Sequence, residues 1–230
     1  MAADKQNKKN DVLSEGIELY RRGDFLASLS FFLTLPDDSD ADAIELSYYV
    51  GLCYAKLKRY DDALLYLEQV VTAGQSVDRV LQCRFLLAVI YAQTDRNKLA
   101  GFELKKLLEA NYKPASVYAA LAYNAWIQDD PDASISFYKK ALELDPNNPT
   151  ALNGYGYVLA CENRDLTAAL SFCKKALKKA PDSAACLDSV GWVYLKLGLM
   201  EDATKYLNLA KDIMPDNEEI KEHLRLLKVS

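Results

Sequence analysis

The stretch DSVGWVYLKLGLMEDATKYLNLAKDIMP, residues 188–215, decides the fold of this chain. Two small residues within it, Gly191 and Ala203, lie 12 positions apart, and apolar residues surround each of them at helical spacing. Pro215 follows the end of the second apolar segment, where a helix stops. Small residues on two successive amphipathic helices let the helices approach closely, so the stretch predicts one helix-turn-helix unit.

The same pair of small residues recurs along the chain at intervals of 34 to 37 residues, with its members 12 positions apart except in the fifth pair, where they are 13 apart. We call the first member of each pair the first anchor and the other the second anchor. The first anchors are Gly16, Gly51, Ala88, Ala122, Gly156 and Gly191, and the second anchors are Ser28, Ala63, Ala100, Ser134, Ala169 and Ala203. A period of this length is typical of stacked helix-turn-helix repeats.

The period predicts an all-α repeat array over residues 9–217. We expect repeats at about 9–43, 44–80, 81–114, 115–148, 149–183 and 184–217, a C-terminal capping helix within 218–230, and a disordered N-terminus over residues 1–8. Asp216 and Glu219 are predicted to form the capping arrangement of the last helix. Replacing Gly191 or Ala203 by a large residue should separate the helices and cost about 1–3 kcal/mol.

The composition suits a soluble folded protein, because half of the residues are hydrophobic and 27% are charged. A net charge of −5 disfavours broad nucleic-acid binding. The four lysines at 174, 175, 178 and 179 are interpreted as the solvated face of one helix. The sequence contains no apolar run long enough to span a membrane and no signal peptide. We therefore expect a cytoplasmic protein, or a periplasmic or envelope-associated one if a native leader has been removed.

The sequence offers no pattern for catalysis, a cofactor or a metal, and we predict that the chain is not an enzyme. Nucleophile-elbow, P-loop and dinucleotide-binding signatures are absent, and the glycines of NGYGYV, residues 153–158, fall inside a predicted helix. Five cysteines and one histidine, His223, do not make a zinc pattern. The cysteines are interpreted as buried reduced thiols, and His223 as a surface or capping residue. Gly154 is a mid-helix glycine, which costs about 1 kcal/mol relative to alanine, and it is interpreted as allowing the close approach of either a neighbouring helix or a ligand.

The chain resembles the tetratricopeptide-repeat (TPR) family from about residue 9 to 217. The resemblance is strongest in residues 188–215 and in VGLCYAKLKRYDDALLYLEQVV, residues 50–71. It is weaker in the first and third repeats, where Leu35 and Leu107 replace a small residue. ALNGYGYVLA (151–160) and EIKEHL (219–224) are also similar to bacterial TPR proteins. The resemblance implies a right-handed α-solenoid with a concave ligand-binding surface.

In TPR proteins the concave surface is lined by residues three before, one after and four after the first anchor, which we call the stripe. These positions share one helix face. The stripe of this chain is unusually apolar and aromatic, and its candidate ligand-binding residues are Tyr48, Phe85, Tyr123, Trp126, Asn153, Tyr157, Asp188 and Trp192. Asn153 is predicted to bind a peptide backbone, and Asp188 a basic ligand residue. Alternatively, stripe residues pack within the array itself.

Our leading hypothesis is a non-enzymatic scaffold that binds a peptide or helical segment of a partner protein in an aromatic groove. One alternative is a homo-oligomeric assembly module, in which a second copy fills the groove or covers the end of the array. A less favoured alternative is an RNA-binding helical repeat that uses residues 174–179.

Overall fold

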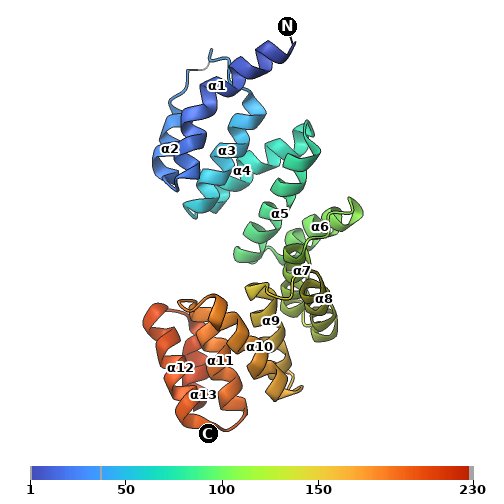
Figure 1. Ribbon diagram of the computed structural model, residues 1–230, viewed down its shortest axis with the longest axis vertical. Coiled ribbons are helices and arrows are strands. Elements are labelled where there is room, and N and C mark those ends of the chain that lie inside the picture. Colours follow the sequence, from blue (N-terminus) through green and yellow to red (C-terminus); the bar gives the residue numbers. More distant parts are fainter. Residues whose placement is uncertain (1, 37, 228–230) are drawn as a thin grey trace. The chain divides into compact units, whose positions relative to one another are not determined.

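The structure is a computed structural model that describes residues 2–36 and 38–227, with side chains from residue 12 onward. The described residues form helices and no strands, as the period predicts. The chain divides into two compact units, residues 1–112 and 113–230. The sequence suggested a single array, but the division falls after the third repeat. This repeat is one of the two in which the family pattern is weaker. Figure 1 shows the helices of both units.

Unit 1 holds three helix pairs, each of which is one repeat (Figure 1). They are α1 (Ala2–Arg21) with α2 (Phe25–Leu33), α3 (Ala43–Lys56) with α4 (Tyr60–Ala73), and α5 (Val77–Gln93) with α6 (Asn97–Glu109). Helix α1 begins at Ala2, whereas we expected disorder over residues 1–8 and a helix from about residue 10. No proline or glycine precedes Gly16, so nothing in the local sequence prevents a helix there.

Unit 2 holds three further pairs and one single helix (Figure 1). The pairs are α7 (Ala115–Ile127) with α8 (Pro131–Leu144), α9 (Pro149–Cys161) with α10 (Leu166–Lys179), and α11 (Ala184–Lys196) with α12 (Met200–Ile213). The single helix is α13 (Glu218–Leu227). Its N-terminus is capped by Asn217, whose Oδ1 accepts from the backbone N–H of Ile220 at 3.0 Å, so the predicted pairing of Asp216 with Glu219 is not the capping arrangement.

The two anchors of each repeat lie at the contact between its helices. All the second anchors have side chains that are completely buried. A Cβ atom added to Gly191 would lie 2.7 Å from Cγ of Leu207 on α12, closer than carbon atoms can pack. In the first repeat the anchors also bond to each other, because the Ser28 hydroxyl donates to the Gly16 carbonyl at 2.8 Å. The anchors therefore set the spacing within each helix pair.

The turn between the paired helices has a left-handed residue at the same position in all six repeats, although the turn of the fifth repeat is one residue longer and has a second such residue, Asp165 (41°). Seven positions after each first anchor stands a residue with positive φ: Gly23 (86°), Lys58 (59°), Asp95 (57°), Asp129 (61°), Asn163 (51°) and Gly198 (74°). Glycine, asparagine and aspartate adopt this conformation at low cost, whereas a lysine pays more for it. The recurrence shows that the sequence period is also a period of the backbone.

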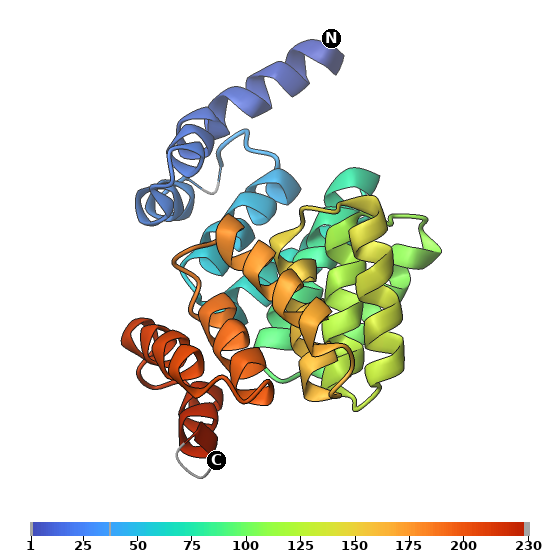
Figure 2. The same cartoon turned by 60° about the horizontal axis from the view of Figure 1, so that its bottom comes forward.

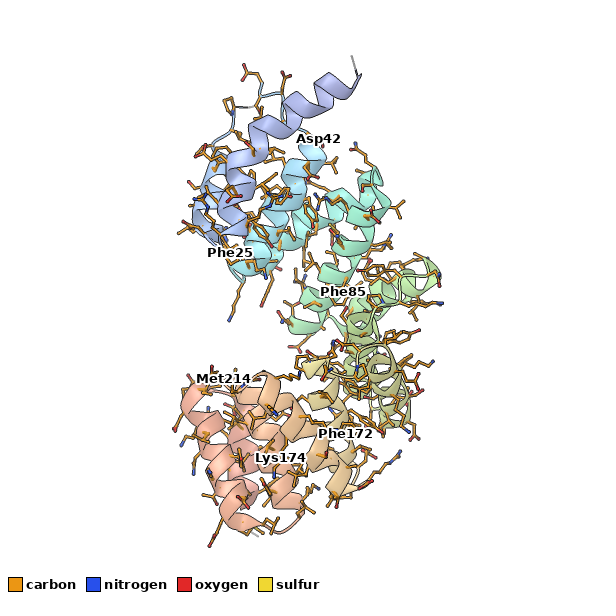
Figure 3. All side chains as sticks on the ribbon, in the orientation of Figure 1. Phe25, Asp42, Phe85, Phe172, Lys174 and Met214 are labelled. Carbon is orange, nitrogen blue, oxygen red and sulfur yellow. The ribbon has the colours of Figure 1, made fainter. Side chains whose placement is uncertain are left out.

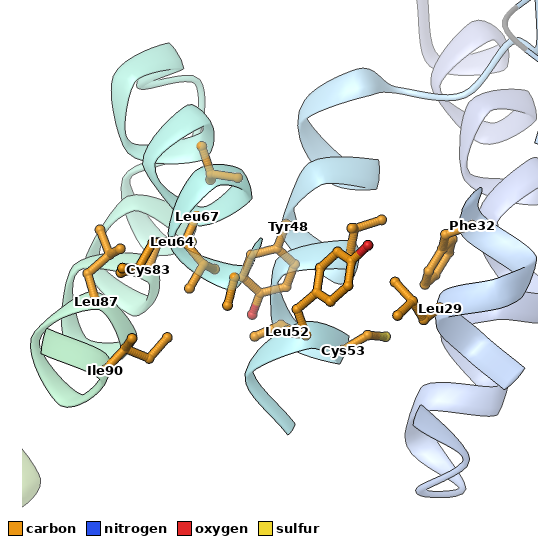
Figure 4. Packing of buried hydrophobic residues seen from close by; sticks show 14 of the residues in the cluster. Leu29, Phe32, Tyr48, Leu52, Cys53, Leu64, Leu67, Cys83, Leu87 and Ile90 are labelled. Atoms are coloured by element: carbon orange, nitrogen blue, oxygen red, sulfur yellow. The ribbon is translucent and has the colours of Figure 1, made fainter. Parts of the chain in front are cut away.

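Each unit has its own hydrophobic core, built from the facing sides of successive pairs. In unit 1 the core runs from Leu29 on α2 through Cys53 on α3 and Leu67 on α4 to Leu87 on α5 (Figure 4). In unit 2 the main core is built around the anchors and the apolar residues that flank them, such as Val158 and Val190. A single pair buries too little apolar surface, so neighbouring repeats stabilise one another.

Candidate functional site

A hollow of about 430 Å³ opens within unit 2. The first helices of the repeats supply most of its wall, joined by Tyr138 of α8, the connection before α11 and the first turn of α13. Its lining residues are Tyr123, Trp126, Ile127, Tyr138, Pro149, Thr150, Asn153, Gly154, Tyr157, Val158, Ala180, Ser183, Ala185, Cys186, Asp188, Ser189 and Glu219. This volume is within the range of pockets that take small ligands or a few side chains.

Five of the eight predicted stripe residues line this hollow: Tyr123, Trp126, Asn153, Tyr157 and Asp188. They come together because each lies three before, one after or four after a first anchor, on the same face of α7, α9 or α11. The rings of Trp126 and Tyr157 meet edge to face, with centroids 6.2 Å apart and planes at 88°. Tyr123 is 45% exposed at the border of the hollow.

Gly154 has a packing role that explains a glycine in the middle of α9. A Cβ atom at this position would collide with the phenol ring of Tyr138 from α8. Tyr138 is 3% exposed, and its burial raises the pKa of its hydroxyl above the usual value. Gly154 and Tyr138 both line the hollow, so the glycine lets α8 supply part of its floor.

Asn153 brings a polar group into the otherwise apolar part of the hollow. Its side chain lines the hollow, and its Oδ1 atom is buried without a hydrogen-bond partner among the described residues. An unpaired buried acceptor is costly, of the order of 1–3 kcal/mol. Because this oxygen is not accessible to solvent, it can accept a hydrogen bond from a group in the hollow only when the carboxamide turns toward that group.

Helix α13 closes one side of the hollow with Glu219. The hydroxyl of Tyr157 on α9 donates to Oε1 of Glu219 at 2.5 Å. Burial, with smaller effects of Cys161 and Glu219, raises the pKa of Tyr157 well above its usual value, so the phenol stays protonated and keeps donating. Glu219 itself is exposed. Its carboxylate therefore faces both the hollow and solvent.

Asp188 is bound to the chain's own histidine, which corrects its predicted role toward a basic ligand residue. Nδ1 of His223 on α13 lies 2.9 Å from one carboxylate oxygen of Asp188 and 3.0 Å from the other. Both side chains are almost fully buried. His223, which the sequence suggested was a surface or capping residue, is thus an internal partner of α11. Figure 2 shows α13 beside α12 at the C-terminal end of unit 2.

Trp192 is also covered by the chain itself and does not belong to the hollow's lining. Its ring stacks on the imidazole of His223, with centroids 4.3 Å apart and planes at 17°. Nζ of Lys196 lies 4.7 Å from the centroid of the same indole. For Trp192 the alternative that we left open, packing within the array, describes the structure.

The two predicted stripe residues of unit 1 are arranged differently. Tyr48 is 7% exposed and lies in the unit 1 core, so its ring is unavailable as a groove wall. Its hydroxyl donates to Oε1 of Gln82 at 2.7 Å. The guanidinium of Arg79 lies 3.9 Å from the centre of the Tyr48 ring and donates to Glu45 at 2.6 Å. Phe85 is half-buried on α5 of unit 1 and so is not part of the hollow.

Sequence reasoning missed Glu219 and His223, the residues that α13 contributes. The period contains a signal for His223, because it follows Asp188 by 35 residues, the interval between repeats. It thus stands at a stripe position of an incomplete seventh repeat, whose first helix is α13. Treating α13 only as a cap hid this position. No comparable signal marks Glu219, since its role depends on how α13 packs.

The lysines of α10 are explained by local contacts rather than by a separate site. Nζ of Lys174 lies 5.0 Å from the centre of the Tyr194 ring, and Nζ of Lys175 lies 5.6 Å from that of Phe172. Figure 3 labels Lys174 and Phe172 on this helix. Lys178 and Lys179 lie in its last turn, where the helix dipole favours positive charge.

The residues that the structure describes contain no cluster of histidine, cysteine and acidic side chains that could hold a metal ion. Among them, no helix has the length and apolar character needed to cross a bilayer. All five cysteines carry free thiols, four of them buried and Cys161 partly buried. Burial raises the pKa of Cys83 to about 12, so this thiol stays protonated near neutral pH.

The fold and the anchor period define an all-α helical-repeat protein. A tetratricopeptide-repeat family model matches residues 13–78 and 119–184, more than half of the chain. The chain therefore belongs to the TPR family, in agreement with the sequence resemblance. TPR repeats generally mediate protein–protein interaction, and the family is typically a non-enzymatic scaffold. A search of curated proteins found no match.

Solved structures with the same fold include several TPR proteins. YrrB, described as a TPR protein with an unusual peptide-binding site, is 21% identical, with a TM-score of 0.53 over 80% of this chain and 92% of that one. A TPR protein from Parabacteroides merdae is 16% identical, with a TM-score of 0.70 over 94% and 83%. Pseudomonas aeruginosa pilF is 13% identical, with a TM-score of 0.73 over 96% and 99%. At these identities the likeness shows the fold alone.

Proposed function

We propose that this chain binds a segment of a partner protein and that the hollow in unit 2 receives it. The observation that carries the proposal is the convergence of five predicted stripe residues, drawn from three helices, on one hollow. Aromatic side chains such as Tyr123 and Trp126 offer large contact area at low entropic cost and are enriched in binding sites. YrrB, with the same fold, is described as peptide-binding.

The chemistry of the hollow favours an extended segment of polypeptide as the ligand. The rings of Trp126 and Tyr157 provide apolar contact, and the carboxamide of Asn153 could accept from a backbone N–H once it turns toward the hollow. The volume of about 430 Å³ has room for a few side chains and not for a folded domain. The remaining affinity would come from contacts around the hollow.

The proposal is tested by selecting peptides from a random 12-residue display library on the immobilised full chain. The affinity of synthetic copies is then measured by fluorescence anisotropy. Ala185 is exposed and lines the hollow, so Ala185→Trp should fill the hollow without disturbing the core. We expect Ala185→Trp and Tyr123→Ala each to weaken binding at least about tenfold, or 1.4 kcal/mol.

Phe102 supplies the matched control, because it is an exposed aromatic residue (53%, against 45% for Tyr123) on α6 of unit 1. Phe102→Ala should leave peptide affinity unchanged. Failure of the library to yield any peptide above the empty support would contradict the proposal. So would selected peptides that bind Ala185→Trp as tightly as the unmodified chain.

A further inference from the structure

The charges around the hollow are of one sign. Its lining contains two carboxylates, Asp188 and Glu219, and neither lysine nor arginine. Asp188 is occupied by its contact with Nδ1 of His223, whereas Glu219 takes part in no ion pair among the described residues. The Glu219 carboxylate accepts a hydrogen bond from the neutral hydroxyl of Tyr157. The hollow thus has a carboxylate without an ion-pair partner next to aromatic rings, and Lys196, beside Trp192, is not part of its lining.

The aromatic part of the hollow has the geometry of a receptor for a cation. Cations bind over the electron-rich faces of tryptophan and tyrosine rings, within about 6 Å of the ring centre. The rings of Trp126 and Tyr157 meet edge to face at 88°, so at least one face of each ring is not covered by the other, and this arrangement makes a corner. The His223 ring lies on another side of Tyr157, with centroids 6.2 Å apart. The Tyr157 hydroxyl connects this corner to the Glu219 carboxylate.

Unit 1 of the same chain contains a filled example of this combination. There, Tyr48 is the stripe residue, its ring carries the Arg79 guanidinium at 3.9 Å, and Arg79 also pairs with the Glu45 carboxylate at 2.6 Å. Aromatic ring, carboxylate and guanidinium thus come together at one stripe position. In unit 2 the ring and the carboxylate are both present, and the lining provides no cation for them.

The helix N-termini that border the hollow favour a negatively charged ligand, but their effect is weaker than that of the Glu219 carboxylate. Thr150 lies in the first turn of α9, and Ala185 in the first turn of α11. Each of these N-termini carries a partial positive charge of about half a unit, and both are already capped. Asn148 accepts from the N–H of Ala151, and Ser183 from that of Cys186. The full negative charge of Glu219 therefore dominates.

We propose that the hollow recognises an arginine or lysine side chain of the partner segment. The cation would lie against the Trp126 and Tyr157 rings, with Glu219 as its counter-ion. The inference rests on the proposed function and specifies its ligand: a peptide segment anchored by a basic residue. Its basis is charge complementarity, since a carboxylate ligand would meet Glu219 with like charge.

The test uses the full chain and the selected 12-residue peptides. Each arginine in a peptide is replaced by citrulline, which keeps the shape and removes the charge, and each lysine by norleucine. We expect one such replacement to weaken binding about tenfold or more. Glu219→Gln keeps an oxygen that accepts from Tyr157 and so preserves the packing of α13, while it removes the counter-ion.

Glu219→Gln should weaken binding of the unmodified peptide by a similar factor, and the binding of the uncharged peptide hardly at all. Such non-additivity identifies a direct interaction between the two groups. Two results would overturn the inference and leave the proposed function standing. One is a set of selected peptides that share no basic residue and whose binding is blocked by Ala185→Trp. The other is equal loss on Glu219→Gln for the charged and uncharged peptides.

Discussion

At the scale of single residues, the second anchors differ in how their polar atoms are satisfied. Ser28 and Ser134 occupy equivalent positions in the first and fourth repeats, and both are fully buried. The Ser28 hydroxyl donates to the Gly16 carbonyl at 2.8 Å, while Oγ of Ser134 has no hydrogen-bond partner among the described residues. The same residue type thus contributes to stability in one repeat and costs stability in the other.

Replacing these serines by alanine should therefore have opposite effects. Ser134→Ala removes an unpaired buried hydroxyl and should raise the free energy of unfolding by about 1 kcal/mol, while Ser28→Ala should lower it by about the same amount. Urea unfolding followed by circular dichroism measures both changes. Two shifts in the same direction would show that the hydrogen bonding of the two hydroxyls does not determine how each substitution changes the free energy of unfolding.

Residue identity also explains which parts of the site the sequence could predict. Tyr123, Trp126, Asn153 and Tyr157 were found because the stripe follows directly from helix periodicity. Tyr48 and Trp192 obey the same periodicity but are covered by Arg79 and His223. Periodicity gives the face of a helix on which a residue lies. It does not reveal whether another side chain of the same protein already covers that face.

At the scale of elements, α13 is the helix whose role differs most from the sequence-based expectation. It was predicted as a cap over the end of the array. In the structure it also completes the hollow through Glu219, and it is fastened to α11 by the pairing of His223 with Asp188. Removing one member of a buried ionisable pair strongly destabilises the fold, because the other member stays buried without a partner.

His223→Ala should therefore lower the free energy of unfolding by about 3 kcal/mol, since it leaves the Asp188 carboxylate buried and unpaired. Lys221→Ala, on the exposed side of the same helix, should leave stability almost unchanged. Tryptophan fluorescence during urea unfolding measures the difference, because Trp192 stacks on His223. Equal effects of the two substitutions would contradict the role given to this contact.

The six helix pairs were predictable from the anchor period, and several helix starts carry a chemical signal of their own. Asp130, directly before Pro131, caps α8, with Oδ1 accepting from the N–H of Ala133. Helix α1 was less predictable, since residues 2–8 lack the apolar periodicity on which the expectation depended. Polar residues with good helix propensity can extend a helix without leaving such a pattern.

At the scale of the whole molecule, the sequence period predicted a TPR array but not its division into two units. The period continues through residue 112 without a break, so spacing alone contains no sign of the division. The candidate site is nevertheless contained within unit 2, because every residue that lines the hollow lies beyond residue 113. The proposed binding thus depends on packing within one unit.

The two tryptophans of the chain allow the most direct test of this account, because one lines the hollow and the other is covered by His223. The measurement is a titration of the ¹⁵N-labelled full chain with a selected peptide, following both indole N–H signals by NMR. We predict a saturable shift of the Trp126 signal and little change in that of Trp192. A peptide that binds while the Trp126 signal stays in place would contradict the claim that the hollow is the binding site.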